Sequence, residues 1–382
     1  MEDQTLPHLS LQISRFRDER LVLISDDASG KGTGHKRAVL AAPAQEISTS
    51  LVNRIISYSG GLCFVALSPA RIQSFQLEKM SRPRLPGSAE DDRRDLDLSV
   101  SVEAREGIST GISAADRAKT IAILGESEPN PRKLVKPGHI FPIQARAGGV
   151  LVRNALPEAA LDFIRLAGFS EAALFVDLLD HSGALMSEHD QALFASTCGI
   201  PRVTISDITR HRLDTEQLVT KVAEARLPVR NAGELRTCVY KSTVHTGEHV
   251  ALVKGDLTGE EPVLTRVQAE FTPADVFGGK HPASRAQLHG AIQAIAARGR
   301  GVLIYLRRQS TGELQQQVAD PLLASSHNPA TMLREYGLGA QILRDLGVKR
   351  IELLTGSRKT LSGLTSFGIE IISQRPIPEV VL

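Results

Sequence analysis

Short apolar runs of strand length alternate with helix-like segments along this chain. LVLIS at 21–25, GLCFVALS at 61–68, ALFVDLL at 173–179 and RVTISDI at 202–208 are bounded by polar residues or glycine, as buried strands are. Residues 157–168 begin with Pro and Glu, repeat apolar residues at helical spacing and end at glycine. This alternation predicts an α/β fold for the first half of the chain.

The second half continues the same rhythm. Strands are predicted at HVALVKG, PVLTRVQAEF, GVLIYLRR, RIELLT and IEIIS, and helices at 285–299 and within LGAQILRDLG. A chain of 382 residues is long enough for two domains, each with its own core. We therefore expect two α/β domains in tandem.

The domain boundary is expected after the strand at 202–208. LDTEQLVTKVAEARLPVR, residues 213–230, predicts a polar, charged helix that ends near Pro228. We therefore place the first domain at 1–212, a linker at 213–227 and the second domain at 228–382. Residues 80–97 are proline-rich and highly charged, which predicts an exposed loop.

Composition argues against several classes of protein. The formal net charge is only +2, so neither nucleic acid nor an anionic membrane surface is an expected partner. No apolar run reaches the roughly 18–20 residues that span a bilayer, and the N-terminus lacks the pattern of a secretory signal. The three cysteines are widely spaced and odd in number, so disulfides are not expected. A cytoplasmic protein is the simplest expectation.

Four segments carry a resemblance to known enzymes. GHIFPIQARAGGVLVR at 138–153 and TGISAADR at 110–117 resemble 3,4-dihydroxy-2-butanone-4-phosphate synthase of riboflavin biosynthesis. VALVKGDLTGEEPVLTRV at 250–267 and GAQILRDLGVKRIELL at 339–354 resemble GTP cyclohydrolase II. Their order is similar to that of the bifunctional fusion and covers nearly the whole chain. The resemblance implies a homodimer that takes a small phosphorylated ligand.

The metal ligands of the lyase family are replaced here. That family holds Mg²⁺ with glutamates of an acidic loop, because Mg²⁺ prefers carboxylate oxygens. The matching loop, SDDASGKGTGHKR, keeps Asp26 and Asp27, has no glutamate, and adds positive charge at Lys31, at Arg37 and between them. Such a glycine-rich basic loop suits a phosphate better than a divalent cation. Mg²⁺ is therefore expected only if the lyase-like site is active.

The second metal ligand of the family is the histidine of a Gly-His-Thr-Glu-Ala turn. NALPEA stands there in this chain, so Leu156 and Pro157 replace the histidine and the threonine, and Glu158 alone remains. Leucine cannot coordinate a metal. Glu158, Asp26, Asp27 and Lys31 are accordingly expected around a substrate, and no residue is expected to be a metal ligand.

Other parts of the lyase pattern are retained. His139 matches a residue essential to catalysis in the family, Arg153 matches one that binds substrate, and Asp177 stands where the family has a catalytic glutamate. Each has a purely structural alternative: a histidine bonded to a loop, a surface ion pair and a polar strand end. Asp116 and Arg117 are expected to fix a turn as a side-chain pair.

The zinc ligands of GTP cyclohydrolase II are replaced as well. The family uses three thiolates spaced Cys-x10-Cys-x-Cys. The matching positions carry Phe271, Pro282 and Ser284, and His281 and His289 have no cysteine between them. Zinc is therefore not expected.

Six polar residues match nucleotide-contacting positions of the cyclohydrolase, although the reaction residues around them differ. Met332 replaces the aspartate proposed as proton acceptor. Polar residues at strand ends and on helix surfaces are the alternative interpretation of this set. The matching residues are Arg266, Glu270, Gln287, Arg334, Tyr336 and Thr355.

Four functions therefore remain as hypotheses. The first is a folded relative without turnover, a pseudoenzyme that binds a partner or a small phosphorylated ligand. The second is an enzyme that uses His139, Arg153 and Asp177 on another sugar phosphate. The third is residual dihydroxybutanone-phosphate synthesis with Asp26 or Asp27 as metal ligands. Intact GTP cyclohydrolase II activity is the fourth and the least supported by the residues present.

Overall fold

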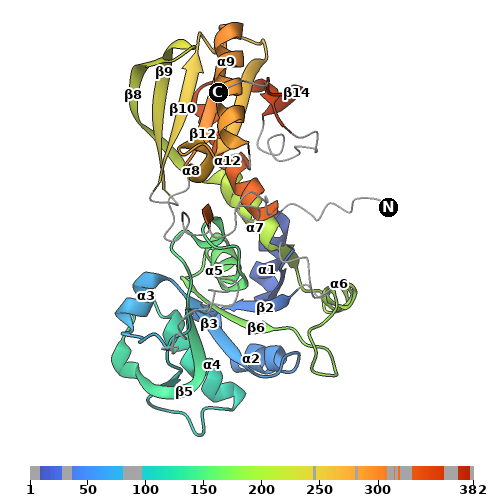
Figure 1. The fold of residues 1–382 in the computed structure, drawn as a ribbon. Helices are drawn as coiled ribbons and strands as arrows, with labels where there is room; N and C mark the ends of the chain where they lie inside the picture. The colour runs from blue at the N-terminus through green and yellow to red at the C-terminus, as the bar shows by residue number, and fades with distance from the viewer. Residues whose placement is uncertain are drawn as a thin grey trace. The chain divides into compact units, whose positions relative to one another are not determined.

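The computed structural model describes residues 9–27, 37–80, 97–243, 247–279, 283–307, 314, 317–318, 329–356 and 369–378. Its contacts divide the chain into two compact units, Met1–Ile208 and Thr209–Leu382, each drawn in Figure 1. Each unit contains one seven-stranded sheet with helices packed on both faces, so the prediction of two α/β domains in tandem is confirmed. Among the described residues, no helix has both the length and the apolar character to cross a bilayer.

The sheet of the first unit has the strand order β4-β5-β3-β6-β2-β1-β7. β3 pairs in parallel with β5 and antiparallel with β6, so the sheet is mixed. Its strands are β1 (Val22–Ser25), β2 (Ala38–Pro43), β3 (Cys63–Leu67), β4 (Val102–Ala104), β5 (Leu134–Gln144), β6 (Ala172–Asp177) and β7 (Arg202–Thr204). The predicted strands at 21–25, 61–68 and 173–179 are therefore confirmed.

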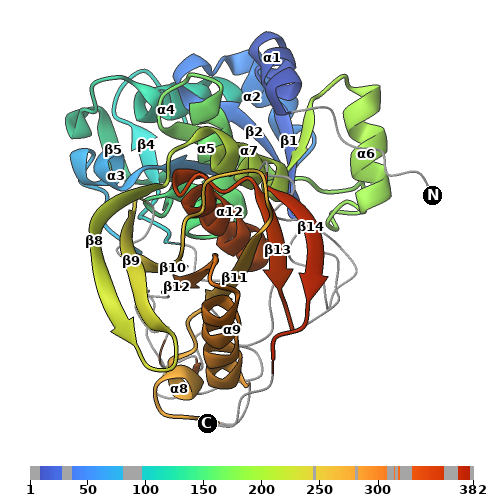
Figure 2. The ribbon, with the colours of Figure 1, turned by 90° about the horizontal axis from the view of Figure 1, so that it is seen from above.

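Helices cover both faces of this sheet, as Figure 1 shows for α1 and α5 on one side and α2 and α4 on the other; Figure 2 gives the same elements from above. α2 and α4 pack on the face that carries Leu40, Val65 and Leu174, and α1 and α5 lie on the other. The helices are α1 (Leu9–Glu19), α2 (Thr49–Ile56), α3 (Pro69–Ser74), α4 (Ala114–Gly125), α5 (Leu156–Leu166), α6 (Glu188–Thr197) and α7 (Ile205–Thr215), with 3-10 turns at Ala44–Glu46, Pro131–Lys133 and Gly149–Leu151. The helix predicted at 157–168 is confirmed as α5.

The strand predicted at 202–208 is only half correct. β7 ends at Thr204, where the side-chain oxygen accepts a hydrogen bond from Asp207 N (3.1 Å) and the Asp207 carboxylate accepts one from Thr204 N (2.9 Å). This reciprocal pair is a capping box, which begins a helix. The chain therefore turns from β7 directly into α7.

The sheet of the second unit has the order β14-β13-β11-β12-β10-β9-β8. α9 packs with Leu264, Leu303 and Leu354 on one face, whereas Gly339 of α12 approaches Val267 on the other. The elements are β8 (Val219–Val229), β9 (Gly233–Ser242), β10 (Glu248–Lys254), β11 (Val263–Ala269), α8 (Thr272–Asp275), α9 (Ser284–Arg298), β12 (Gly301–Leu306), α12 (Pro329–Asp345), β13 (Arg350–Leu354) and β14 (Glu370–Arg375). The predicted helices and strands of this half are confirmed.

The helix expected within residues 213–230 is wrong beyond Thr215, where α7 ends. Most of this segment forms β8, an edge strand that pairs antiparallel with β9 through Val229, with a bulge between Lys221 and Ala223. Nearly all β8 side chains are exposed, so no buried face gave the segment a strand-like pattern. Pro228 lies within this edge strand, a position that tolerates a residue without an N–H. The loop expected at 80–97 lies almost wholly outside the described residues.

Candidate functional site

Three phenylalanines fix the relative positions of two predicted site residues on the sheet of the first unit. Phe64 pairs with Phe141 on β5 and with Phe175 on β6, and its ring centroid lies 6.1 and 5.4 Å from theirs. His139 precedes Phe141 by two residues, and Asp177 follows Phe175 by two. Because side chains alternate along a strand and the two pairings run in opposite directions, His139 and Asp177 lie on one face at the same level, with β3 between them.

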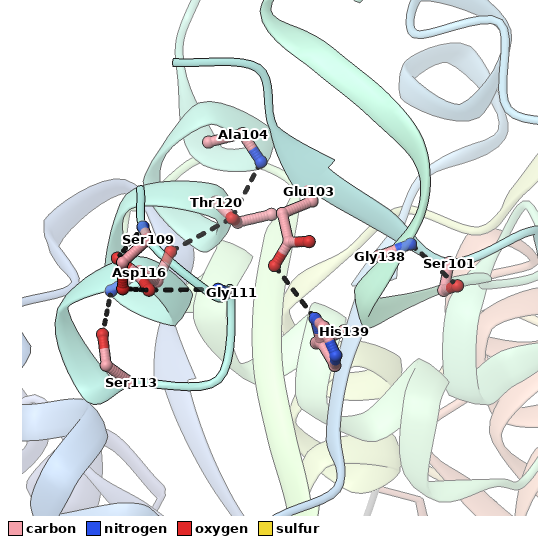
Figure 3. Close-up of polar contacts among 10 residues, drawn as sticks. All are labelled: Ser101, Glu103, Ala104, Ser109, Gly111, Ser113, Asp116, Thr120, Gly138 and His139. Carbon is pink, nitrogen blue, oxygen red and sulfur yellow. Dashed lines mark hydrogen bonds and ion pairs between the residues drawn. The ribbon is translucent and has the colours of Figure 1, made fainter. Parts of the chain in front are cut away.

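His139 is held by a carboxylate from the neighbouring strand β4. Its Nδ1 lies 3.0 Å from Glu103 Oε1 (Figure 3). The Glu103 side chain is only 13% exposed, whereas that of His139 is 43% exposed. A largely buried carboxylate therefore holds a histidine whose ring reaches solvent. The loop-bonded alternative for His139 does not describe this geometry.

Asp177 is paired with a cation. Arg37 Nη2 lies 2.8 Å from Asp177 Oδ1 across β2 and β6. The same stretch brings in the start of the glycine-rich loop, because Asp26 N donates to the Arg37 carbonyl at 2.8 Å. Asp27 points elsewhere, since its Oδ1 accepts a hydrogen bond from Ser206 N. Of the predicted aspartates, Asp177 and Asp26 therefore lie beside Arg37, whereas Asp27 lies at the start of α7.

Arg153 and Glu158 form an ion pair at the beginning of α5. The distance from Arg153 Nη2 to Glu158 Oε1 is 2.7 Å; the Glu158 side chain is fully buried and that of Arg153 is 18% exposed. Glu158 Oε1 also accepts a hydrogen bond from Arg146 N at 2.8 Å. Burial raises the pKa of Glu158, against the opposing effect of Arg153. The surface ion pair considered for Arg153 is therefore a largely buried one.

The start of α5 lies toward the same end of the sheet as Asp177. Residues 167–171 join α5 to β6 directly, so the helix and the strand run antiparallel on one face. Asp177 is the last residue of β6, and Glu158 is in the first turn of α5. The candidate site of the first unit therefore contains four predicted residues. His139 and Asp177 come from the sheet, and Arg153 and Glu158 come from the start of α5.

The residues at this site do not fit a magnesium ion. Leu156, at the position of the family's histidine ligand, is only 5% exposed in the first turn of α5 and offers no donor atom. The carboxylates of Asp177 and Glu158 are each engaged by an arginine. Among the described residues, no group of three or more His, Cys, Asp or Glu side chains could hold a metal ion. Lys31 lies outside the described residues.

In the second unit, two positions that match zinc ligands are each engaged in hydrogen bonds with other residues. Phe271 is buried, and its N–H donates to Asp275 Oδ2 at 2.8 Å, an oxygen that also accepts from Tyr305 at 2.7 Å. The Ser284 hydroxyl accepts a hydrogen bond from Gln268 at 3.0 Å. Neither residue offers a thiolate, so this part of the site does not fit zinc. Pro282 lies outside the described residues.

Four of the six nucleotide-matching residues gather around one guanidinium. Arg266 on β11 donates to Gln287 Oε1 (3.1 Å) and to the carbonyl of Leu354 (3.2 Å), the residue before Thr355. Tyr336 on α12 interacts with Arg266 electrostatically. Desolvation lowers the pKa of Arg266 to about 10. The guanidinium is thus buried and bonded to neutral oxygens.

Two nucleotide-matching residues remain, Glu270 and Arg334. Glu270 Oε2 is 3.9 Å from Arg307 Nε, and Glu270 Oε1 accepts a hydrogen bond from Thr272. Arg334 precedes Tyr336 by two residues on α12 and is half-buried. Met332 also lies on α12.

Sequence reasoning missed Glu103 and the role of Arg37. Glu103 precedes the TGISAADR segment and lies 36 residues from His139, so only the pairing of β4 with β5 brings the two together. Asp116 does fix a turn, by accepting hydrogen bonds from Ser109 and Gly111, but the expected pairing with Arg117 is replaced by a bond from Arg117 to the carbonyl of Gly61.

The two units match two family models along most of the chain. Residues 11–211 match the 3,4-dihydroxy-2-butanone 4-phosphate synthase model, and residues 220–376 match the GTP cyclohydrolase II model. The chain belongs to the bifunctional riboflavin-biosynthesis family that joins these two domains.

Individual relatives share this arrangement over nearly their whole length. The riboflavin biosynthesis protein RibBA of Chlorobium phaeovibrioides is 33% identical over 99% of this chain and 92% of its own. RibBA of Aquifex aeolicus is 34% identical over 96% and 91%. The crystal structure of RibBX from A. baumannii, a two-domain 3,4-dihydroxy-2-butanone 4-phosphate synthase, superposes with a TM-score of 0.78 at 27% identity and covers 97% of this chain and 99% of its own.

Proposed function

We propose that this riboflavin-biosynthesis family member binds a small phosphorylated ligand in its first unit without a divalent cation and does not hydrolyse GTP. The observation that carries the proposal is the buried Leu156 at the start of α5, where a metal-binding relative needs a donor. On this proposal the chain is a pseudoenzyme, and neither Mg²⁺ nor zinc is a resident cofactor.

Two arginines at the site support an anionic ligand. Arg37 is held by Asp177 and Arg153 by Glu158. A guanidinium has five donors, so the contact with Asp177 orients Arg37, whose side chain is 48% exposed, and leaves other N–H groups for a phosphate. Lys31 and its basic neighbours in the sequence add positive charge next to Arg37. Binding is therefore expected to weaken with salt, because exposed charges are screened.

Calorimetry with ribulose 5-phosphate, with and without EDTA, tests the proposal. We expect binding that EDTA does not change, that Arg37→Gln weakens strongly and Lys31→Ala weakens more modestly. Arg132→Gln is the matched control, because Arg132 is an exposed arginine of the 3-10 turn before β5. Binding that requires Mg²⁺ would contradict the proposal, and the absence of binding would leave only a scaffold.

A residual or repurposed lyase is the second candidate, and the Glu103–His139 pair favours it. A carboxylate-held histidine is a common general base, and the A. baumannii relative is described as a dihydroxybutanone-phosphate synthase. A second similar structure, which covers 55% of this chain with a TM-score of 0.50, is a 3,4-dihydroxy-2-butanone 4-phosphate synthase in complex with two magnesium ions. Release of formate from ribulose 5-phosphate with Mg²⁺, lost in His139→Asn, would establish this candidate in place of the first.

Assembly and location complete the proposal. We infer a homodimer, which the family resemblance supports, and a cytoplasmic location, which the three widely spaced cysteines support because a disulfide framework is not expected. Light scattering at several protein concentrations tests the dimer: a mass of one chain, 41.2 kDa, at all concentrations would refute it.

A further inference from the structure

We propose that Glu103 is a positioning residue, which holds the neutral His139 ring in the form protonated on Nδ1 and so leaves Nε2 as the atom that meets a ligand. The part of the inference that concerns a ligand rests on the proposed site, whereas the part that concerns the histidine tautomer does not. Neither a family motif nor any predicted site residue had pointed to Glu103.

The contact itself fixes which nitrogen is used. His139 Nδ1, and not Nε2, lies 3.0 Å from Glu103 Oε1. An ionised carboxylate can only accept, so in the neutral ring Nδ1 carries the proton and Nε2 carries the lone pair. Figure 3 shows the second ring nitrogen pointing away from Glu103. With the ring 43% exposed, this nitrogen is the one available to a ligand hydroxyl or phosphate.

The Glu103 carboxylate is confined by a loop built for it. Gly111 has φ +80°, and a Cβ at this position would overlap the Glu103 carboxylate. The loop is held in turn by Asp116, which accepts from Ser109 Oγ at 2.8 Å and from Gly111 N at 3.0 Å. These hydrogen bonds lower the pKa of Asp116, and the bond from the Ser109 side chain has the largest effect. Glycine therefore suits this position, because its φ strains other residues and a Cβ would displace the carboxylate.

The backbone on either side is fixed as well. Ala104 N donates to Thr120 Oγ1 at 3.0 Å, which anchors the residue after Glu103 to α4. Gly138 N donates to Ser101 Oγ at 3.2 Å, and a Cβ at Gly138 would overlap the Val102 backbone. Both members of the pair are therefore placed by their own strands, and the ring orientation is set before any ligand arrives.

Nitrogen-15 spectra of the histidine rings test the inference in the intact chain. At about pH 8.5, where histidine side chains are ordinarily neutral, we expect the wild-type His139 signals to show protonated Nδ1 and unprotonated Nε2. The chain has 11 histidines, so His139→Asn assigns the signals. Glu103→Ala should lose the fixed tautomer, whereas Glu103→Gln should retain it, because the amide oxygen can still accept. Glu106→Ala, an exposed acid on the same segment, should change nothing.

A fixed Nδ1–H form that persists in Glu103→Ala would overturn the inference, and so would its loss in Glu106→Ala. Addition of ribulose 5-phosphate separates this result from the proposed function. A wild-type Nε2 signal that shifts with ligand, and shifts at least about tenfold less at equal ligand concentration in Glu103→Ala, supports both. A correct tautomer with an Nε2 signal that never responds supports the role of Glu103 and refutes a ligand at His139.

Discussion

Replacing Arg153 should lower the free energy of unfolding far more than replacing Glu158, although either change breaks the same ion pair. In Arg153→Met, Glu158 keeps its charge at full burial and loses the cation that pairs with it in the described part of the chain. Removing one partner of a buried ion pair costs about 3–5 kcal/mol. In Glu158→Gln, the amide oxygen still accepts from Arg146 N and from Arg153, so the loss is about 1 kcal/mol. The double variant contains no buried anion and should lie within about 2 kcal/mol of the wild type.

The sign of the pH dependence follows from Glu158. Burial already raises its pKa above the ordinary 4.5, and removing Arg153 removes the opposing effect. For an acid whose folded-state pKa is raised, the unfavourable energy is absent below the unfolded-state pKa and develops as pH rises through the folded-state value. Arg153→Met should therefore be far less destabilised at pH 4.5 than at pH 8.

Hydrogen exchange followed by mass spectrometry is the suitable assay. The chain has no tryptophan, and Tyr58 is the one tyrosine of four in the first unit, so fluorescence reports poorly on this unit. A two-unit chain also need not unfold in one step. At about tenfold per 1.4 kcal/mol, peptides from α5 and β6 should exchange about 100- to 3,000-fold faster in Arg153→Met at pH 8. A change below about fivefold, or one equal to that in Glu158→Gln, would refute the reasoning.

Three further outcomes are expected. Metal analysis should find far less than one zinc per chain, and incubation with GTP should release no formate, because Phe271 and Ser284 supply no thiolate. One zinc per chain would contradict this. Tyr305→Phe should cost the second unit about 1 kcal/mol in urea unfolding; because burial raises the Tyr305 pKa, its contribution should be present below about pH 10 and fall above it, and an equal loss at all pH values would argue against this. Gly111→Ala should destabilise the first unit by about 1–3 kcal/mol and displace Glu103, giving the same histidine spectrum as Glu103→Ala; an unchanged spectrum would show that the loop has room.

Helix-end residues and continuous apolar runs in the sequence predicted the helices and strands that contain them. α5 was predicted from its proline at the start and from Gly168, whose φ of +92° ends it. The buried strands β1, β3 and β6 were predicted because continuous apolar runs of strand length need cover on both faces. β8 was missed because Lys221, Glu224 and Arg226 favour a helix locally, while pairing with β9 alone makes it a strand.

The candidate site divides in the same way. His139, Arg153 and Asp177 follow from motifs, and the structure places His139 and Asp177 at one level of the sheet. The partners Glu103 and Arg37 depend on register between strands that are distant in sequence, which no local pattern encodes. Sequence reasoning could name the groups at the site but not which charge each one meets.

The exposed edge strand β8 has a consequence for how this protein behaves at high concentration. An open edge offers unpaired backbone groups to any extended chain, and growth by strand addition leads to aggregates. β8 interrupts that template in two places, with the bulge after Lys221 and with Pro228, which has no N–H to offer. Its exposed charged side chains, Lys221, Glu224 and Arg226 among them, would also have to lose water if another strand paired with β8. Addition of a further strand to β8 is therefore disfavoured, and this edge of the second sheet does not promote aggregation.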